Sequence, residues 1–90
     1  MPYNRTMTVT VLLFASVAEK AGRRSVEVPS GEGDTVRAVC ERLFDSYPDL
    51  RAFAPRLVYA INEEYAHADD PVPPGATLAL IPPVSGGQEC

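Results

Sequence analysis

Residues 34–47 read DTVRAVCERLFDSY, and their apolar side chains recur with the period of an α-helix. Charged side chains occupy the opposite side of the same stretch, so the helix is amphipathic. Asp34 or Thr35 can cap its first turn, and Pro48 disfavours helical geometry at the residue before it. The pattern predicts one helix over 34–47 that packs its apolar stripe on a sheet. The stripe consists of Val36, Val39, Cys40, Leu43, Phe44 and Tyr47.

Residues on both sides of this helix predict β-strands. In residues 7–14, MTVTVLLF, one face carries Val9, Val11 and Leu13, and the other carries Leu12 and Phe14. Apolar residues on both faces are typical of a central strand. Further strands are predicted at 25–29, 57–61, 65–66 and 77–81, the first of them forming a hairpin with 7–14. The connections are a short segment at 15–22 with room for a helical turn, a linker at 49–56, a turn at 62–64 and a loop at 67–76.

The order of these elements predicts an α+β domain with its helix on one face of the sheet. The first and last strands are the most apolar, so we expect them side by side at the centre. That arrangement is the β-grasp (ubiquitin-like) mixed sheet with one main helix packed on one face. A ferredoxin-like alternative needs a second long helix, and 51–56 is too short and broken by proline. The expected division is a flexible N-terminus at 1–6, the β-grasp domain at 7–83 and a flexible C-terminal tail at 84–90.

Length and charge exclude several classes of function. The chain has 90 residues and a net charge of −4, which argues against nucleic-acid binding because phosphates require a basic face. The basic doublet Arg23-Arg24 is interpreted as a solvated strand edge, and an acidic chain suits a partner with a basic docking surface. No apolar run approaches the roughly 20 residues of a membrane span, and residues 1–6 lack a secretion signal. We expect a cytoplasmic protein that binds no membrane.

Candidate catalytic groups are scarce. The one histidine, His67, lies in a polar segment beside Asp69 and Asp70, where such residues are usually solvated. Cys40 falls on the apolar helix face, Cys90 is the last residue, and the two make no metal-ligand spacing. We therefore expect no bound cofactor, no metal and no self-contained active site.

The segment after the last strand carries the chemistry. It reads PPVSGG at 82–87, two prolines that stiffen the chain followed by two glycines that keep its end narrow. Four residues past Pro83 reach roughly 13–14 Å when extended, enough to enter another protein's active site. We expect an exposed apolar patch at this end of the domain that binds a partner. The predicted partner-binding residues are Ile81, Pro82, Pro83, Val84, Ser85 and Gly86.

These residues resemble the small subunit of molybdopterin synthase (MoaD-like) and, more broadly, the ubiquitin-like sulfur carriers that include ThiS. The resemblance covers nearly all of 8–87. It includes VTVLLFA at 9–15, the helix start DTV at 34–36, VYAIN at 58–62 and, most specifically, LALIPPVSGG at 78–87. The last segment is similar to the molybdopterin synthase branch rather than the thiamin branch.

The resemblance implies a carrier cycle in which Gly87 is the site of adenylation and sulfur attachment. A ubiquitin-activating-enzyme-like adenylyltransferase (MoeB/ThiF-like) uses ATP to activate the terminal glycine carboxylate, and a sulfur donor converts it to a thiocarboxylate. The synthase large subunit (MoaE-like), or another sulfur acceptor enzyme, then takes the tail into its active site. Each pocket belongs to a partner.

The sequence departs from the family pattern at two places. The acidic turn that often precedes the last strand is PGAT at 74–77, and the chain continues past the double glycine with Gln88-Glu89-Cys90. While 88–90 remain, Gly87 has no free carboxylate, so a processing metalloprotease is expected. Two alternatives stay open: a sulfur carrier for cysteine, thiamin or secondary-metabolite sulfur, and a non-catalytic ubiquitin-like interaction module or modifier.

Overall fold

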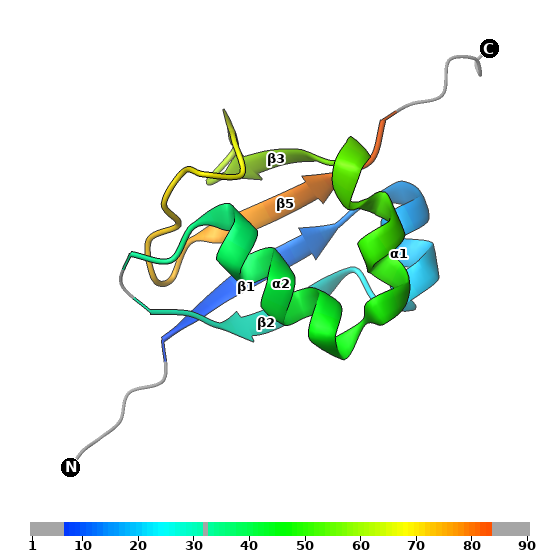
Figure 1. The fold of residues 1–90 in the computed structure, drawn as a ribbon, viewed down its shortest axis with the longest axis horizontal. Helices are drawn as coiled ribbons and strands as arrows, with labels where there is room; N and C mark the ends of the chain where they lie inside the picture. Colours follow the sequence, from blue (N-terminus) through cyan, green and yellow to red (C-terminus); the bar gives the residue numbers. More distant parts are fainter. Residues whose placement is uncertain (1–6, 32, 84–90) are drawn as a thin grey trace.

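The computed structural model describes residues 7–31 and 33–83 (Figure 1). The ends that the sequence predicts to be flexible, 1–6 and 84–90, lie outside the described residues. No helix in the described part of the chain is long and apolar enough to cross a membrane. The elements in chain order are β1 (Thr8–Leu13), α1 (Ala15–Ala21), β2 (Ser25–Pro29), α2 (Val36–Ser46), the 3-10 helix η1 (Pro48–Arg56), β3 (Val58–Ile61), β4 (Glu64–Ala66) and β5 (Thr77–Ile81).

The five strands form one mixed sheet in the order β2-β1-β5-β3-β4. β1 and β5 are parallel neighbours at its centre, with Leu13 opposite Leu80, and the other pairings are antiparallel. The two most apolar strands therefore lie side by side, and β1 and β2 form the expected hairpin. The β-grasp prediction is confirmed.

Helix α2 begins where the sequence predicts, and the structure selects its cap. The side chain of Thr35 accepts a hydrogen bond from the backbone N–H of Ala38 at 3.2 Å, which satisfies a free donor of the first turn. Asp34 has another role: its carboxylate accepts a hydrogen bond from the backbone N–H of Gly31 at 2.8 Å and one from Arg42 at 2.5 Å. At the other end, Tyr47 closes the helix with its N–H on the carbonyl of Leu43 at 2.8 Å, directly before Pro48.

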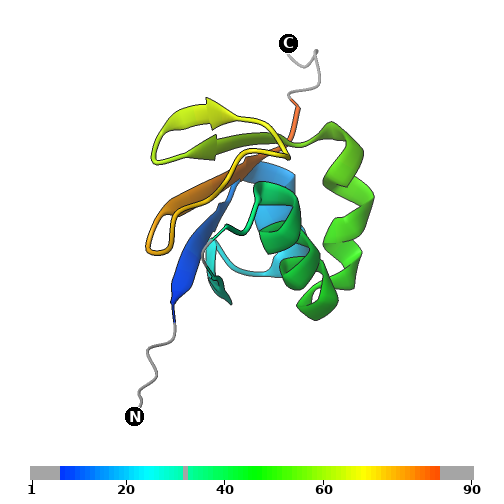
Figure 2. The same cartoon turned by 60° about the vertical axis from the view of Figure 1, so that its left-hand side comes forward.

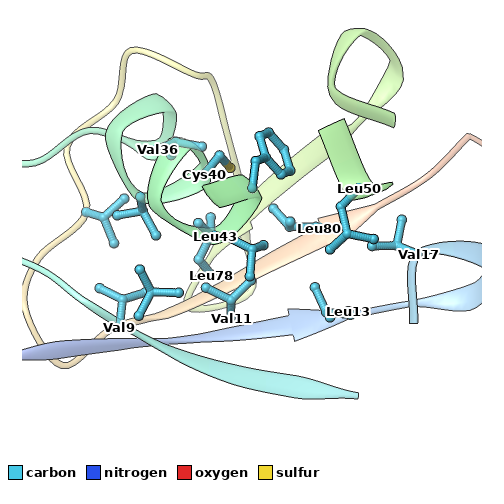
Figure 3. Close-up of a cluster of buried hydrophobic side chains, with 14 of the residues drawn as sticks. Val9, Val11, Leu13, Val17, Val36, Cys40, Leu43, Leu50, Leu78 and Leu80 are labelled. Carbon is cyan, nitrogen blue, oxygen red and sulfur yellow. The ribbon is translucent and has the colours of Figure 1, made fainter. Parts of the chain in front are cut away.

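The core lies between α2 and one face of the sheet (Figure 3). All five predicted helix residues Val36, Val39, Cys40, Leu43 and Phe44 are buried, and Tyr47 at the end of the stripe is half-buried. They meet alternate residues of the central strands, which are buried with them. These strand residues are Val9, Val11, Leu13, Leu78 and Leu80.

Two connections are more regular than predicted. Residues 15–21 form a seven-residue α-helix, α1, which inserts Val17 into the core and ends at Gly22 with φ of 75°. The linker prediction for 49–56 is wrong, because Pro48–Arg56 is a 3-10 helix with Pro48 at its first position and Leu50 only 1% exposed. Proline presets the helical φ, and burial of Leu50 stabilises the turn against α2. Neither segment supplies the second long helix that a ferredoxin-like fold needs.

Candidate functional site

The chain leaves the sheet toward the tail at the C-terminal ends of the two central strands, β1 and β5. Ile81, the last residue of β5, lies opposite Val58 at the start of β3, and Leu80 lies opposite Leu13 at the end of β1. Pro82 is half-buried and Pro83 is exposed. The C-terminal ends of β1 and β5 and the start of β3 therefore surround the point from which the chain continues toward the double glycine (Figure 1).

The sheet face opposite the helices is open in the described residues. Figure 2 shows α2 and η1 together on one side of the sheet. The other side has a shallow concavity of about 700 Å³. Its lining residues are Leu12, Phe14, Ala60, Asn62, Glu63, Tyr65, Thr77, Ala79 and Ile81. We call this surface the open-face concavity.

Ile81 lies on this face, as the alternation of β5 predicts. Its neighbour Leu80 is fully buried beneath the helices, while Ile81 is half-buried and lines the open-face concavity beside Ala79. The apolar surface continues from Ile81 toward Pro82. Ile81 of the predicted apolar patch thus faces away from the core, Val84 lies outside the described residues, and the role of the patch in partner binding stays a prediction.

Sequence reasoning missed the other apolar members of this face. Phe14 is 44% exposed, Val58 41% and Tyr65 82%. Leu12 and Phe14 were interpreted as the second face of a central strand, but that second face is surface. Phe14 is also not part of β1: it is the residue before α1, and the chain turns at Ala15 with φ of 51°. The sequence signal for this exposed apolar face was the uninterrupted apolar run VLLFA at 11–15, because one buried strand face requires apolar residues only at alternate positions.

The far rim of the open-face concavity is held by the β3–β4 turn. The backbone N–H of Asn62 donates to the carbonyl of Thr77 at 2.8 Å, and its side-chain oxygen accepts from the N–H of Thr77 at 3.0 Å. Asn62 and Glu63 have φ of 50° and 74°, the left-handed pair that a two-residue hairpin turn requires. The predicted turn is thus pinned to the start of β5.

The remaining chemical candidates are structural or exposed. The backbone N–H of His67 donates to the Asp70 carboxylate at 2.9 Å, closing a surface turn, and the His67 side chain is 88% exposed. Within residues 7–31 and 33–83, no three His, Cys, Asp or Glu side chains lie close enough to hold a metal ion. Cys40 is 3% exposed, and burial raises the pKa of its thiol to about 12, so it stays protonated.

The structure describes three of the six predicted partner-binding residues and does not describe Gly87. Ile81, Pro82 and Pro83 are described, whereas Val84, Ser85, Gly86, Gly87 and the extension at 88–90 lie outside the described residues. Gly87, the predicted site of sulfur attachment, is therefore four positions beyond Pro83, the last described residue. The part of the site that the structure describes is a platform at the base of the tail.

Comparisons with known proteins agree with this geometry. The ThiS family matches residues 11–87 of the chain. The molybdopterin synthase sulfur carrier subunit of Arabidopsis thaliana is 33% identical over 82 residues, which is 91% of this chain and 85% of that one. The crystal structure of SAMP1 from Haloferax volcanii is 34% identical with a TM-score of 0.80, covering 89% of this chain and 99% of that one.

A more distant structure shares the fold alone. It is a protein–protein complex of subunits 1 and 2 of the molybdopterin-converting factor from Helicobacter pylori, 18% identical with a TM-score of 0.63 over 90% of this chain and all of that one. The match to 11–87 spans the sheet, the helix and the double glycine, and a relative at 33% identity covers nearly the same range. This chain therefore belongs to the ThiS family of ubiquitin-like sulfur carriers.

Proposed function

We propose that this chain is the small, sulfur-carrying subunit of a molybdopterin synthase. The observation that carries the proposal is the pairing of a rigid β-grasp platform with a Pro-Pro-Val-Ser-Gly-Gly tail that starts at the end of its central strand. The relatives named as molybdopterin synthase sulfur carrier subunits support the choice of pathway. The described residues bring together no nucleophile and base, so the reaction centres are assigned to the partners.

The proposed cycle starts from a free carboxylate on Gly87. An adenylyltransferase (MoeB/ThiF-like) transfers AMP from ATP to this carboxylate and releases pyrophosphate. A sulfur donor then displaces AMP from the acyl carbon and leaves a thiocarboxylate at Gly87. In the large subunit (MoaE-like) the sulfur acts as the nucleophile towards a pterin precursor, and water restores the carboxylate.

The encoded chain cannot enter this cycle directly, because Gly87 is joined to Gln88 and has no free carboxylate. We propose that a metalloprotease removes residues 88–90. The residues that would occupy its narrow site are Gly86 and Gly87, whose lack of side chains leaves the bond accessible to a protease.

The open-face concavity is the proposed docking surface for the large subunit. Exposed aromatic side chains beside aliphatic ones are typical of residues that anchor protein interfaces. Phe14 and Ile81 provide such a group at the base of the tail, and Tyr65 adds an exposed ring farther along the same concavity. Docking there would direct residues 84–87 into the partner.

Intact-mass measurement tests the carrier function. The chain truncated after Gly87 is incubated with its adenylyltransferase, ATP and a sulfur donor, and a matched sample lacks ATP. We expect an ATP-dependent mass increase equal to the exchange of one oxygen for sulfur, located at Gly87 by fragmentation. An unchanged mass, with an adenylyltransferase shown to be active on another carrier, would contradict the proposal.

A protein modifier is the second candidate. Its support is the likeness to SAMP1 from Haloferax volcanii, at 34% identity, because structures of this group are described as small archaeal modifier proteins. A modifier would appear in cells as Gly87 joined to lysine side chains of other proteins. Affinity capture of the tagged chain followed by peptide mass spectrometry separates the two functions. The other sulfur pathways differ only in the acceptor that captures the thiocarboxylate.

A further inference from the structure

The basic residues that the structure describes divide into two groups. In the described residues, Arg37, Arg42 and Arg51 each form an ion pair, with Asp69, with Asp34, and with both Glu41 and Asp45 respectively. All three lie on α2 or η1, on the helical side of the domain. The described cations that form no ion pair with another described residue are Lys20, Arg23, Arg24 and Arg56.

The sheet register brings two of these cations to the edge from which the tail leaves. The carbonyl of Arg24 accepts a hydrogen bond from Leu13 at the end of β1, at 2.8 Å. Arg56 lies two residues before Val58, which is opposite Ile81. In the strand order of the sheet, Arg24 precedes β2, two strands from β5 on one side, and Arg56 precedes β3, one strand from β5 on the other. Neighbouring strands are about 4.8 Å apart. The two cations flank the base of the tail.

The other two cations belong to the same end of the domain. Lys20 is in the last turn of α1, which begins directly after the end of β1, and Arg23 precedes Arg24. All four side chains belong to exposed residues. Arg23 also donates a hydrogen bond to the hydroxyl of Tyr47 at 3.4 Å. We call Lys20, Arg23, Arg24 and Arg56 the basic rim.

Carboxylates gather at the opposite edge of the sheet. Glu63 and Glu64 lie in and after the β3–β4 turn, which is bonded to Thr77 at the start of β5, and Asp69 and Asp70 follow in the next loop. Near the basic rim, Glu19 shares a concavity with Arg24 at the end of β1. The net charge of the chain is −4, yet the described cations that form no ion pair with another described residue lie where the tail begins.

We infer that the basic rim is a docking element for an acidic surface surrounding the tunnel that admits the tail, on the large subunit of the proposed synthase. Complementary charge on a partner orients and accelerates association, and exposed cations that form no ion pair with another described residue are available for it. The basic rim is continuous with the apolar platform, because Phe14 and Leu12 line both the open-face concavity and the concavity that contains Arg24. The net charge alone predicts a partner with a basic docking surface. At the end of the sheet where the tail begins, we infer the opposite, an acidic surface on the partner.

The test rests on the proposed function and uses the large subunit from the same genome as the probe. Association with the full chain, and in parallel with the chain ending at Gly87, is followed by biolayer interferometry at low and high salt. The test variant is Arg24→Gln with Arg56→Gln. The control is Arg37→Gln with Arg51→Gln, which changes the net charge equally and removes exposed ion pairs and the contact of Arg51 over the Phe44 ring, all on the helical side.

The basic-rim variant is expected to associate about 3- to 10-fold more slowly than wild type near 50 mM NaCl, and the difference to fall below about 2-fold near 500 mM. The control should stay within about 2-fold of wild type at both salt concentrations. Equal slowing of both variants, or none, would overturn the inference while leaving the proposed function standing. Absence of wild-type binding in both chain lengths would refute the proposed partner and the inference with it.

Discussion

At the scale of single residues, the structure separates two neighbours that the sequence makes equivalent. Asp34 and Thr35 are both good capping residues, and only Thr35 caps α2. Asp34 connects the segment before the helix to Arg42, one of whose guanidinium nitrogens also donates to the carbonyl of Pro29 at 3.1 Å. β2 is an edge strand, and Pro29 at its end has no N–H to offer another strand. Because Arg42 also occupies the Pro29 carbonyl, neither backbone group of this residue is free to pair with another strand.

This ion pair predicts how stability depends on acid. The hydrogen bond from Arg42, followed by that from the N–H of Gly31, lowers the pKa of Asp34 below its ordinary value of 3.8. A lowered pKa stabilises the fold above the ordinary value, and the contribution is lost as pH falls from about 4 through the folded pKa. Asp34→Asn should therefore cost about 1 kcal/mol at pH 7 and progressively less as the pH falls below about 4.

Urea unfolding over this pH range measures the difference. Asp45→Asn is the matched control, because its carboxylate is 81% exposed and 3.8 Å from Arg51, and it should change stability little at any pH. A deficit of Asp34→Asn that does not shrink as the pH falls below about 4 would show that the carboxylate charge is not what stabilises the loop.

At the scale of elements, β5 has two faces with different tasks. Leu78 and Leu80 are fully buried against the helices, and Ala79 and Ile81 line the open-face concavity. The strand alternation alone predicted this division. Leu78 and Leu80 are buried because a parallel partner on one side and an antiparallel one on the other make β5 central in the sheet.

The two faces should respond differently to the same substitution. Ile81→Asp is expected to lower the free energy of unfolding by less than about 1.5 kcal/mol, because the aspartate stays in contact with water. Leu80→Asp, one residue away, should cost about 4 kcal/mol or more, since it buries a charge and removes core volume.

Binding to the synthase large subunit separates the roles further. Ile81→Asp should weaken it at least about tenfold if the residue anchors the interface. If Ile81→Asp instead unfolds the domain as Leu80→Asp does, Ile81 belongs to the core and the docking surface lies elsewhere.

At the scale of the whole molecule, the β-grasp brings the end of the chain to the C-terminal edge of its two central strands. The parallel pairing gives β5 the same direction as β1, so the chain leaves the sheet after Ile81 near Phe14 and Ala15 rather than beside the acidic β3–β4 turn. The apolar platform, the basic rim and the base of the tail consequently occupy one end of the domain. A partner can engage all three together.

The encoded extension predicts a difference between two lengths of the same chain. The chain truncated after Gly87 should support ATP–pyrophosphate exchange by the adenylyltransferase, and the full chain should not, because its Gly87 carbonyl is an amide. Gly87→Ala in the truncated chain should reduce exchange, since a methyl group crowds a narrow tunnel. Equal exchange by both lengths would mean that the enzyme accepts the Cys90 carboxylate, and Gly87 would then not be the sulfur site.

The sequence alone determined the strands, helix α2 and the place of the tail after the last strand, because periodicity records burial directly. The stripe of α2, the two-faced run of β1 and the Pro-Pro stop after Ile81 each follow from neighbours within a few residues. Family membership followed from the same local segments, above all residues 78–87.

Only the tertiary structure decided what lies across the sheet. Pro48–Arg56 became a 3-10 helix because Leu50 finds a place in the core, which no local pattern encodes. Phe14 and Tyr65 share one concavity, and Arg24 and Arg56 flank the base of the tail, because β1 pairs with β5 (Thr10 with Thr77) and β3 pairs with β5 (Val58 with Ile81), far apart in the sequence. Long-range register is set by packing of the whole core, so a doublet that looked like an ordinary strand edge in the sequence became part of a basic rim at the tail.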